Sequence, residues 1–261
     1  CVVERIEACQ LPNDFAVLIE GPVDSLDGED FDPSRDSDAD RLVVQRLAEL
    51  ARRLHARAVN IHLIAPSTDL GRLTLDCRKA LLKQSVRLVR EFVNRMAEAN
   101  AVPTLENMPP VLRMRRSDFA FTPIGMASAD LLWMAERVPG VRLMVDTSHA
   151  GLYLNAHTAE RIDEPWGERL RGYLRQLPQE PPDVLGYAQA LQPYLSNAQI
   201  ANARGVLGEG LPYEEGDLHL DPIIAWLGEH VEHIVTETIE ANHDEAVFMR
   251  GALKHMRAVL V

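Results

Sequence analysis

The sequence predicts an α/β fold in which a parallel sheet closes into a barrel. Short runs of apolar and β-branched residues alternate along the chain with longer segments of helical period, as in repeated strand–helix units. The connections after the strands are longer and more polar than those before them, for example residues 21–39 and 205–221. In a parallel barrel the loops that follow the strands form the active-site face, so this asymmetry favours a barrel with a site at that end.

Six strands are expected, because six apolar runs of five to seven residues are bounded by polar or turn-forming residues. In chain order they cover residues 15–20, 58–64, 102–106, 141–146, 198–202 and 233–237. Helices are expected at residues 40–55, 77–99, 128–138, 183–194, 222–230 and 244–260, where apolar residues recur with helical spacing. Asp183 follows two prolines and is a suitable N-cap for the fourth helix. The segment 155–182, which contains Trp166, is expected to be an irregular insertion over the site or on the surface.

The composition excludes several classes of protein. The 261 residues are 46% hydrophobic and 25% charged, as in an ordinary folded globular chain. A net charge of −12 repels a phosphate backbone, so no nucleic-acid partner is expected. The three cysteines lack the spacing of a zinc site or a disulfide framework, which favours the reducing cytoplasm. No apolar run reaches the roughly 18 residues of a membrane span, so no membrane partner is expected.

Ionisable residues end four of the six predicted strands. The four acids are Glu20, Glu106, Asp146 and Glu237, and the other two strands contain His62 and Gln199. Barrel closure brings the carboxyl ends of all strands into one ring. Carboxylates that converge there repel one another unless a cation lies between them. The sequence therefore predicts a divalent-metal site, whose oxygen-rich ligands suit Mn²⁺, Mg²⁺ or Co²⁺, with Zn²⁺ as an alternative.

Five short motifs follow one another in a consistent order from about residue 55 to the C-terminus. They are residues 105–107 (LEN), 145–150 (VDTSHA), 199–205 (QIANARG), 215–218 (EGDL) and 235–237 (VTE). In this order and spacing the chain resembles the xylose isomerase-like TIM barrels, and within them the sugar phosphate isomerase/epimerase family. The resemblance implies a (β/α)8 TIM barrel.

The same resemblance implies a role for each motif. One divalent ion would be bound by Glu106, Asp146, Gln199 and Glu237, and the catalytic carboxylates would be Glu106 and Glu237. His149 corresponds to a histidine that usually touches the substrate in these families. Most members have His where this chain has Gln199. The glutamine resembles the hydroxypyruvate isomerase branch and weakens the case for zinc, because an amide is a poorer zinc ligand than imidazole.

Three further residues are candidates for contact with a substrate. His62 lies in a strand whose carboxyl end belongs to the same active-site face of the barrel. It either binds a substrate hydroxyl or is a buried structural imidazole. Glu20 either belongs to the site or begins the following loop. Arg204 precedes a glycine in a loop and either meets a phosphate or carboxylate of the substrate or remains solvated.

The predicted function is a metal-dependent sugar or sugar-phosphate isomerase or epimerase that transfers a proton through a metal-stabilised enediolate. The sequence leaves isomerisation and epimerisation both open. The alternatives are a dehydratase, hence a lyase, of a cyclic keto-polyol such as an inosose or dehydroshikimate, and a non-catalytic ligand-binding member. The apurinic endonuclease branch is disfavoured, because its additional histidines are lacking and the net charge is negative. The expected partner is a small carbohydrate, and the resemblance implies association into homo-oligomers.

Residues 1–261 form one domain in this interpretation, and that domain is an incomplete barrel. The motifs occupy what would be the last four strands, so residues 15–20 correspond to the third strand and residues 2–8 to the end of the second helix. We expect the first one or two strand–helix units, on the order of 40–50 residues, to be missing from the chain. Cys1 is accordingly not expected to be the biological start.

Overall fold

The computed structural model describes residues 15–113, 119–240, 242 and 245–261. Within them, six parallel strands form one sheet in the order β1-β2-β3-β6-β7-β10. These strands are β1 (Leu18–Glu20), β2 (Ala58–His62), β3 (Val102–Glu106), β6 (Arg142–Asp146), β7 (Leu195–Ile200) and β10 (His233–Thr236). Each stands where a strand was predicted, so the α/β class and the six-strand pattern are confirmed. The predicted helix at residues 2–8 lies outside the described residues.

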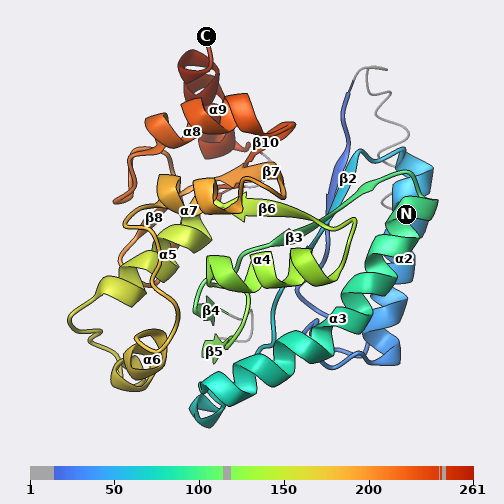
Figure 1. The fold of residues 1–261 in the computed structure, drawn as a ribbon. Helices are drawn as coiled ribbons and strands as arrows, with labels where there is room; N and C mark the ends of the chain where they lie inside the picture. The colour runs from blue at the N-terminus through green and yellow to red at the C-terminus, as the bar shows by residue number, and fades with distance from the viewer. Residues whose placement is uncertain (1–14, 114–118, 241, 243–244) are drawn as a thin grey trace.

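Helices surround the curved sheet (Figure 1). Those at predicted positions are α2 (Asp38–Leu54), α3 (Leu75–Glu98), α4 (Ser128–Arg137), α7 (Val184–Leu191), α8 (Leu220–His230) and α9 (Val247–Val259). The side chains of Ser37, Thr74 and Asp183 accept hydrogen bonds from the first-turn amides of α2, α3 and α7, which fixes where these helices begin. The predicted cap at Asp183 is therefore confirmed. None of the described helices combines the length and apolar sequence that a membrane crossing requires.

Several described elements were not predicted. They are two hairpins, β4 (Val111–Arg113) with β5 (Phe119–Phe121) and β8 (Asn202–Arg204) with β9 (Gly208–Leu211), the helices α5 (Thr147–Thr158) and α6 (Gly167–Leu174), and the short 3₁₀ turn η1 (Leu70–Arg72). Helix α5 is buried nearly all round, so it lacks the apolar stripe by which a surface helix is recognised.

The segment 155–182 is more regular than expected. It contains the end of α5 and all of α6. The ring of Trp166 lies 5.4 Å from that of Phe121 and 5.9 Å from that of Phe119, so this segment packs on the β4–β5 hairpin. Trp166 is buried there and does not line the cavity described below.

Gly125, in the loop after β5, packs closely against the backbone of Leu63, which follows β2. Its φ of +85° lies in the left-handed region, and a Cβ built there would approach the carbonyl oxygen of Leu63 to 1.7 Å. The Gly125 amide donates to Asp130 Oδ2 at 3.0 Å, and its carbonyl accepts from the Met108 amide at 2.9 Å. Glycine at this position therefore lets two loops pack closely beside the carboxyl ends of β2 and β3.

Candidate functional site

Polar side chains at or just after the carboxyl ends of β1, β2, β6 and β10 line one cavity, and those that end β3 and lie in β7 contact them. The parallel register sets His62 beside Glu106 and Asp146 beside Gln199. The cavity has a volume of about 200 Å³ and is lined by Glu20, Val23, Asp24, His62, Ile64, Met108, Pro109, Leu112, His149, Glu209 and Glu237. The structure thus brings the predicted strand-end residues together, as expected for a curved parallel sheet.

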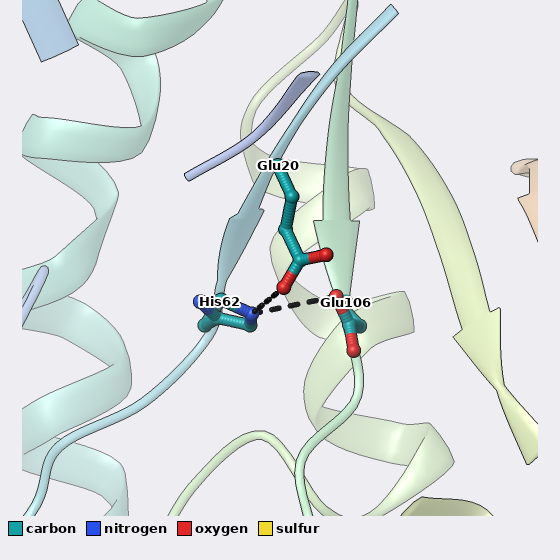
Figure 2. Close-up of side chains that lie close together, drawn as sticks. All are labelled: Glu20, His62 and Glu106. Atoms are coloured by element: carbon teal, nitrogen blue, oxygen red, sulfur yellow. Dashed lines mark ion pairs between the residues drawn. The ribbon is translucent and has the colours of Figure 1, made fainter. Parts of the chain in front are cut away.

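On one side of the cavity an imidazole lies between two carboxylates (Figure 2). His62 Nε2 is 3.3 Å from Glu20 Oε1 and 3.5 Å from Glu106 Oε2. Glu106 is 1% exposed, and its Oε2 also accepts a hydrogen bond from the Asn60 amide. Burial alone would lower the pKa of His62, but the Glu106 and Glu20 carboxylates outweigh it and raise that pKa above its ordinary value.

On the other side His149 is held through both ring nitrogens. Nδ1 lies 2.9 Å from the Asn107 carbonyl oxygen and 3.1 Å from Glu106 Oε1, while Nε2 lies 3.0 Å from Glu209 Oε1. Burial disfavours the cationic ring, but Asp146, Glu106 and Glu209 together hold the pKa of His149 well above its ordinary value. Both ring nitrogens of His149 therefore face acceptor oxygens.

Asn107 links the ends of β3 and β6. Its Oδ1 accepts from the Asp146 backbone N–H at 2.8 Å, and its Nδ2 donates to the Asp146 carbonyl at 3.1 Å. Asp146 in turn caps α5, since its Oδ1 accepts from the His149 amide at 2.6 Å. The two motifs that contain these residues are therefore joined by side-chain bonds to backbone, which fixes the spacing of the Glu106 and Asp146 carboxylates.

The site carries more negative charge than its own cations neutralise. Burial, with further repulsion from Asp146, Glu106 and Glu20, raises the pKa of Glu237 to about 10. Burial raises the pKa of Asp146 to about 7, because the attraction of His149 only partly offsets that burial. Such shifts mark carboxylates that lack a compensating positive charge.

Three buried oxygens at the site have no hydrogen-bond partner in the described part of the chain. They are Glu237 Oε2, Gln199 Oε1 and Glu106 Oε1, of which the last lies 3.1 Å from His149 Nδ1. Gln199 is 5% exposed, and its Nε2 donates to Glu20 Oε2 at 3.0 Å, which leaves its carbonyl oxygen as the unpaired end of the amide. Buried polar atoms are rarely left unpaired, and carboxylate and carbonyl oxygens are the ligands of hard divalent cations. The residues present therefore fit a divalent ion.

Two groups of three described side chains are close enough to share a metal ion. One is Glu106, Asp146 and His149, and the other is Glu20, His62 and Glu106; in each, one ligand atom per residue lies within 4.8 Å of the others. Glu106 belongs to both groups. Among the residues of the predicted ligand set, Glu106 and Asp146 are thus adjacent, whereas Glu237 is in neither compact group.

Arg204 is not brought to this cavity. It is exposed on β8, and its guanidinium donates to the backbone carbonyl of Glu215. The preceding motif residue Asn202 organises the same loop, since its side chain bonds the backbone of Tyr213 and Leu218. Contact between Arg204 and a substrate remains a prediction.

Sequence reasoning missed three residues that support the site: Asn60, Asn107 as a cross-link, and Glu209. Asn60 is a buried amide in the middle of a strand, a signal that was available because polar residues are unusual there. Glu209 lies in the β9 strand of a hairpin, and no sequence pattern indicates its proximity to His149, 60 residues earlier.

Comparison with known proteins identifies the fold. No protein-family model matches the sequence, and the search of curated proteins returned no match. Similar solved structures include a D-tagatose 3-epimerase-like protein, with 16% identity, a TM-score of 0.69 and coverage of 99% of this chain and 83% of that one. The 3-keto-D-glucoside 4-epimerase YcjR from E. coli has 12% identity and a TM-score of 0.64, with coverage of 98% and 83%. D-psicose 3-epimerase with D-tagatose, from Clostridium cellulolyticum H10, has 14% identity and a TM-score of 0.62, with coverage of 99% and 83%. At these identities the comparison shows the fold alone, and the chain shares the TIM-barrel fold of these structures.

Proposed function

We propose that the protein is a metal-dependent carbohydrate isomerase or epimerase. It would move a proton between an enzyme carboxylate and the carbon next to a sugar carbonyl. The observation that carries the proposal is the convergence of strand-end carboxylates at one cavity. Glu237, which lines it, and Gln199, which bonds Glu20 at its wall, each have a buried oxygen without a hydrogen-bond partner among the described residues. Similar solved structures include a tagatose 3-epimerase-like protein, a ketoglucoside 4-epimerase and a psicose 3-epimerase, which supports a carbohydrate as the substrate.

The proposed ligands of the ion are Glu106, Asp146, Gln199 and Glu237. Three carboxylates and one amide carbonyl form an oxygen-rich set that suits Mn²⁺, Mg²⁺ or Co²⁺. When bound, such an ion supplies Lewis acidity that polarises the substrate carbonyl and acidifies the neighbouring C–H. His149 stays outside the ligand set in this proposal, because both its nitrogens already face acceptors.

The proton would be carried by Glu106 and Glu237. In the sheet order β6 and β7 separate β3, which ends at Glu106, from β10, which precedes Glu237. The two carboxylates thus belong to different parts of the curved sheet, so one would remove the proton and the other would return it. His62 lines the cavity and would donate a hydrogen bond to a substrate oxygen, while His149 lines it with its Nε2 on Glu209.

The test is proton exchange measured by NMR. Metal-loaded protein is incubated in D₂O with a panel of ketoses and cyclic keto-polyols, and the expected product carries deuterium at one carbon next to the carbonyl. Glu106→Gln and Glu237→Gln are expected to lower the rate by at least about 100-fold, the range seen for loss of a general acid or base. Glu98→Gln, which changes an exposed carboxylate on α3, serves as the control and keeps the wild-type rate.

Three results would contradict the proposal. Loss of water from a cyclic substrate would replace it with a dehydratase. Exchange at the wild-type rate in both Gln variants would remove their assigned roles. Absence of both bound metal and turnover would favour a non-catalytic ligand-binding protein.

A further inference from the structure

We propose that Glu209 determines the specificity of the proposed reaction, because its carboxylate meets the substrate from the hairpin in which an arginine was the expected contact. A carboxylate accepts hydrogen bonds from sugar hydroxyls and repels anionic groups. The end of the substrate that reaches Glu209 is therefore an uncharged polyol, without a phosphate or carboxylate. This inference rests on the proposed function and deepens it, because it names the class of carbohydrate.

The β8–β9 hairpin brings Glu209, rather than Arg204, to the cavity. Glu209 lies on β9 and lines the cavity, whereas Arg204 is exposed on β8 and is not among the described residues of the lining. The guanidinium of Arg204 donates to the backbone carbonyl of Glu215, in the loop that follows β9. The arginine thus holds its own loop, and the side chain that the hairpin offers to a substrate is a hydrogen-bond acceptor.

Backbone contacts hold β9 in place from two sides. The amide of Gly210, the residue after Glu209, donates to Ser148 Oγ on α5 at 2.9 Å, and the Gly210 carbonyl accepts from the Ile239 amide at 2.8 Å. The φ of Gly210 is +63°, and a Cβ built there would approach Ile239 Cγ1 to 2.6 Å. Because α5 follows β6 and Ile239 follows β10, the position of Glu209 is fixed relative to both strand ends.

Glu209 lies against His149, the histidine that the resemblance assigns to substrate contact. Glu209 Oε1 is 3.0 Å from His149 Nε2, and 32% of the Glu209 side chain is exposed, compared with 10% of that of His149. The carboxylate is therefore the more accessible member of the pair. A carboxylate has about four acceptor positions, so it can contact an imidazole nitrogen and still accept from a hydroxyl. A substrate that approaches this pair meets an acceptor.

The charged residues of the lining also disfavour an anion. Four of the described lining residues are acids, namely Glu20, Asp24, Glu209 and Glu237, and none of the described lining residues is a lysine or an arginine. Asp24 is exposed and, like Glu209, lies outside the proposed ligand set of the ion. A phosphate placed beside these two carboxylates faces like charge, which opposes its binding.

The rest of the lining is apolar and the cavity is small. Five lining residues have side chains without a hydrogen-bond donor for a phosphate or carboxylate: Val23, Ile64, Met108, Pro109 and Leu112. They can pack against the C–H groups of a sugar. The cavity volume of about 200 Å³ is below the roughly 300–1,000 Å³ of sites for drug-sized ligands, so it suits a monosaccharide.

The experiment measures the binding of sugar probes to Mg²⁺-loaded protein by saturation-transfer NMR titration. The probes are the ketohexoses D-fructose, D-tagatose and D-psicose and the terminal phosphate ester of each. Wild-type protein is expected to bind at least one ketose about 100-fold more tightly than its ester, because the ester meets like charge. Glu209→Gln keeps the size of the side chain but removes its charge. It is expected to weaken ketose binding about 10-fold and to lower the ratio of the two affinities at least about 10-fold.

The ratio of affinities is the readout, because a purely structural defect weakens both probes together. Glu209→Lys is expected to lower the ratio further than Glu209→Gln. The matched control is Glu214→Gln, which removes one negative charge from the loop after β9. Glu214 is exposed and is not among the described lining residues, so this variant is expected to keep the wild-type ratio.

Binding and turnover separate the failure of this inference from that of the proposed function. Deuterium exchange in D₂O with a ratio that is unchanged in Glu209→Gln overturns the role of Glu209 and leaves the proposed function intact. A preference for the ketose that is lost in Glu209→Gln, in a protein without deuterium exchange, supports the role of Glu209 and removes the proposed reaction. Tight binding of an ester that depends on Arg204, or binding of none of the probes, overturns the inference.

Discussion

Asn107 supports the site without being one of the proposed ligands, and its removal is a direct test of how the site is built. In Asn107→Ala, the backbone N–H and carbonyl of Asp146 lose partners at 2.8 Å and 3.1 Å. Both groups are buried, since Asn107 is 0% and Asp146 2% exposed. An unpaired buried polar group costs about 1–3 kcal/mol, so the variant is expected to lose about 4 kcal/mol of unfolding free energy.

Thermal unfolding measures this loss. For a chain of this size 1 kcal/mol lowers Tm by about 2–4 °C, so a decrease of about 10 °C is expected. Metal affinity is expected to fall about 10–100-fold, as for other residues that orient ligands. Asn155→Ala is the control, because its side chain donates to the Gly205 carbonyl at 2.9 Å, at the surface, and to no other described residue. A Tm within 2 °C of wild type, together with unchanged metal affinity, would refute the role of Asn107.

Three further predictions concern the parts that hold the barrel together. Gly125→Ala brings a Cβ to within 1.7 Å of the Leu63 carbonyl and should cost more than about 4 kcal/mol, so a Tm within 2 °C of wild type would contradict the clash. Glu180→Ala removes the acceptor of the Ser128 amide and hydroxyl at the start of α4, where no local side chain caps the helix. Urea unfolding should show that the free energy of unfolding falls by about 1–3 kcal/mol, and an unchanged urea midpoint would contradict this cap. Burial raises the pKa of Asp130 from 3.8 to about 6, so the folded state binds the extra proton and unfolding free energy should fall by up to about 3 kcal/mol as pH rises from about 4 to 6. Asp130→Asn should lack this component of the pH dependence, and parallel stability curves for the two proteins would exclude it.

The sequence was sufficient for the parallel sheet because each strand is a local pattern. The run AVNIHLI, for example, is apolar at nearly every position, and β2 is buried along its whole length. Strand limits were less well predicted. Residues 15–20 were expected to be one strand, but β1 begins only at Leu18, the first residue that pairs with β2, at Ala58. Pairing between distant segments decides where a strand begins, and the composition of a single segment does not contain that information.

The hairpins and α5 could not be predicted for a related reason. β8 and β9 have three and four residues, too few to show an alternation of apolar and polar side chains. α5 has polar residues in its first turn and is buried on nearly every side, so no apolar stripe distinguishes it from a loop. It forms because Asp146 caps its first turn and because neighbouring elements cover it from several directions.

The site residues that were predicted are marked by a local sequence pattern, whereas those that were missed depend on contacts between distant segments. A charge at the end of a buried strand contradicts the apolar pattern around it, so Glu106 and Asp146 were visible in the sequence alone. Asn107 and Glu209 contradict no local pattern, and their importance comes from contacts with residues 39 and 60 positions away. The carboxylates that would bind metal repel one another, so they lower the free energy of unfolding when no cation is bound. The bonds of Asn107 to the Asp146 backbone oppose that repulsion, because they hold the two strand ends together whether or not an ion is present.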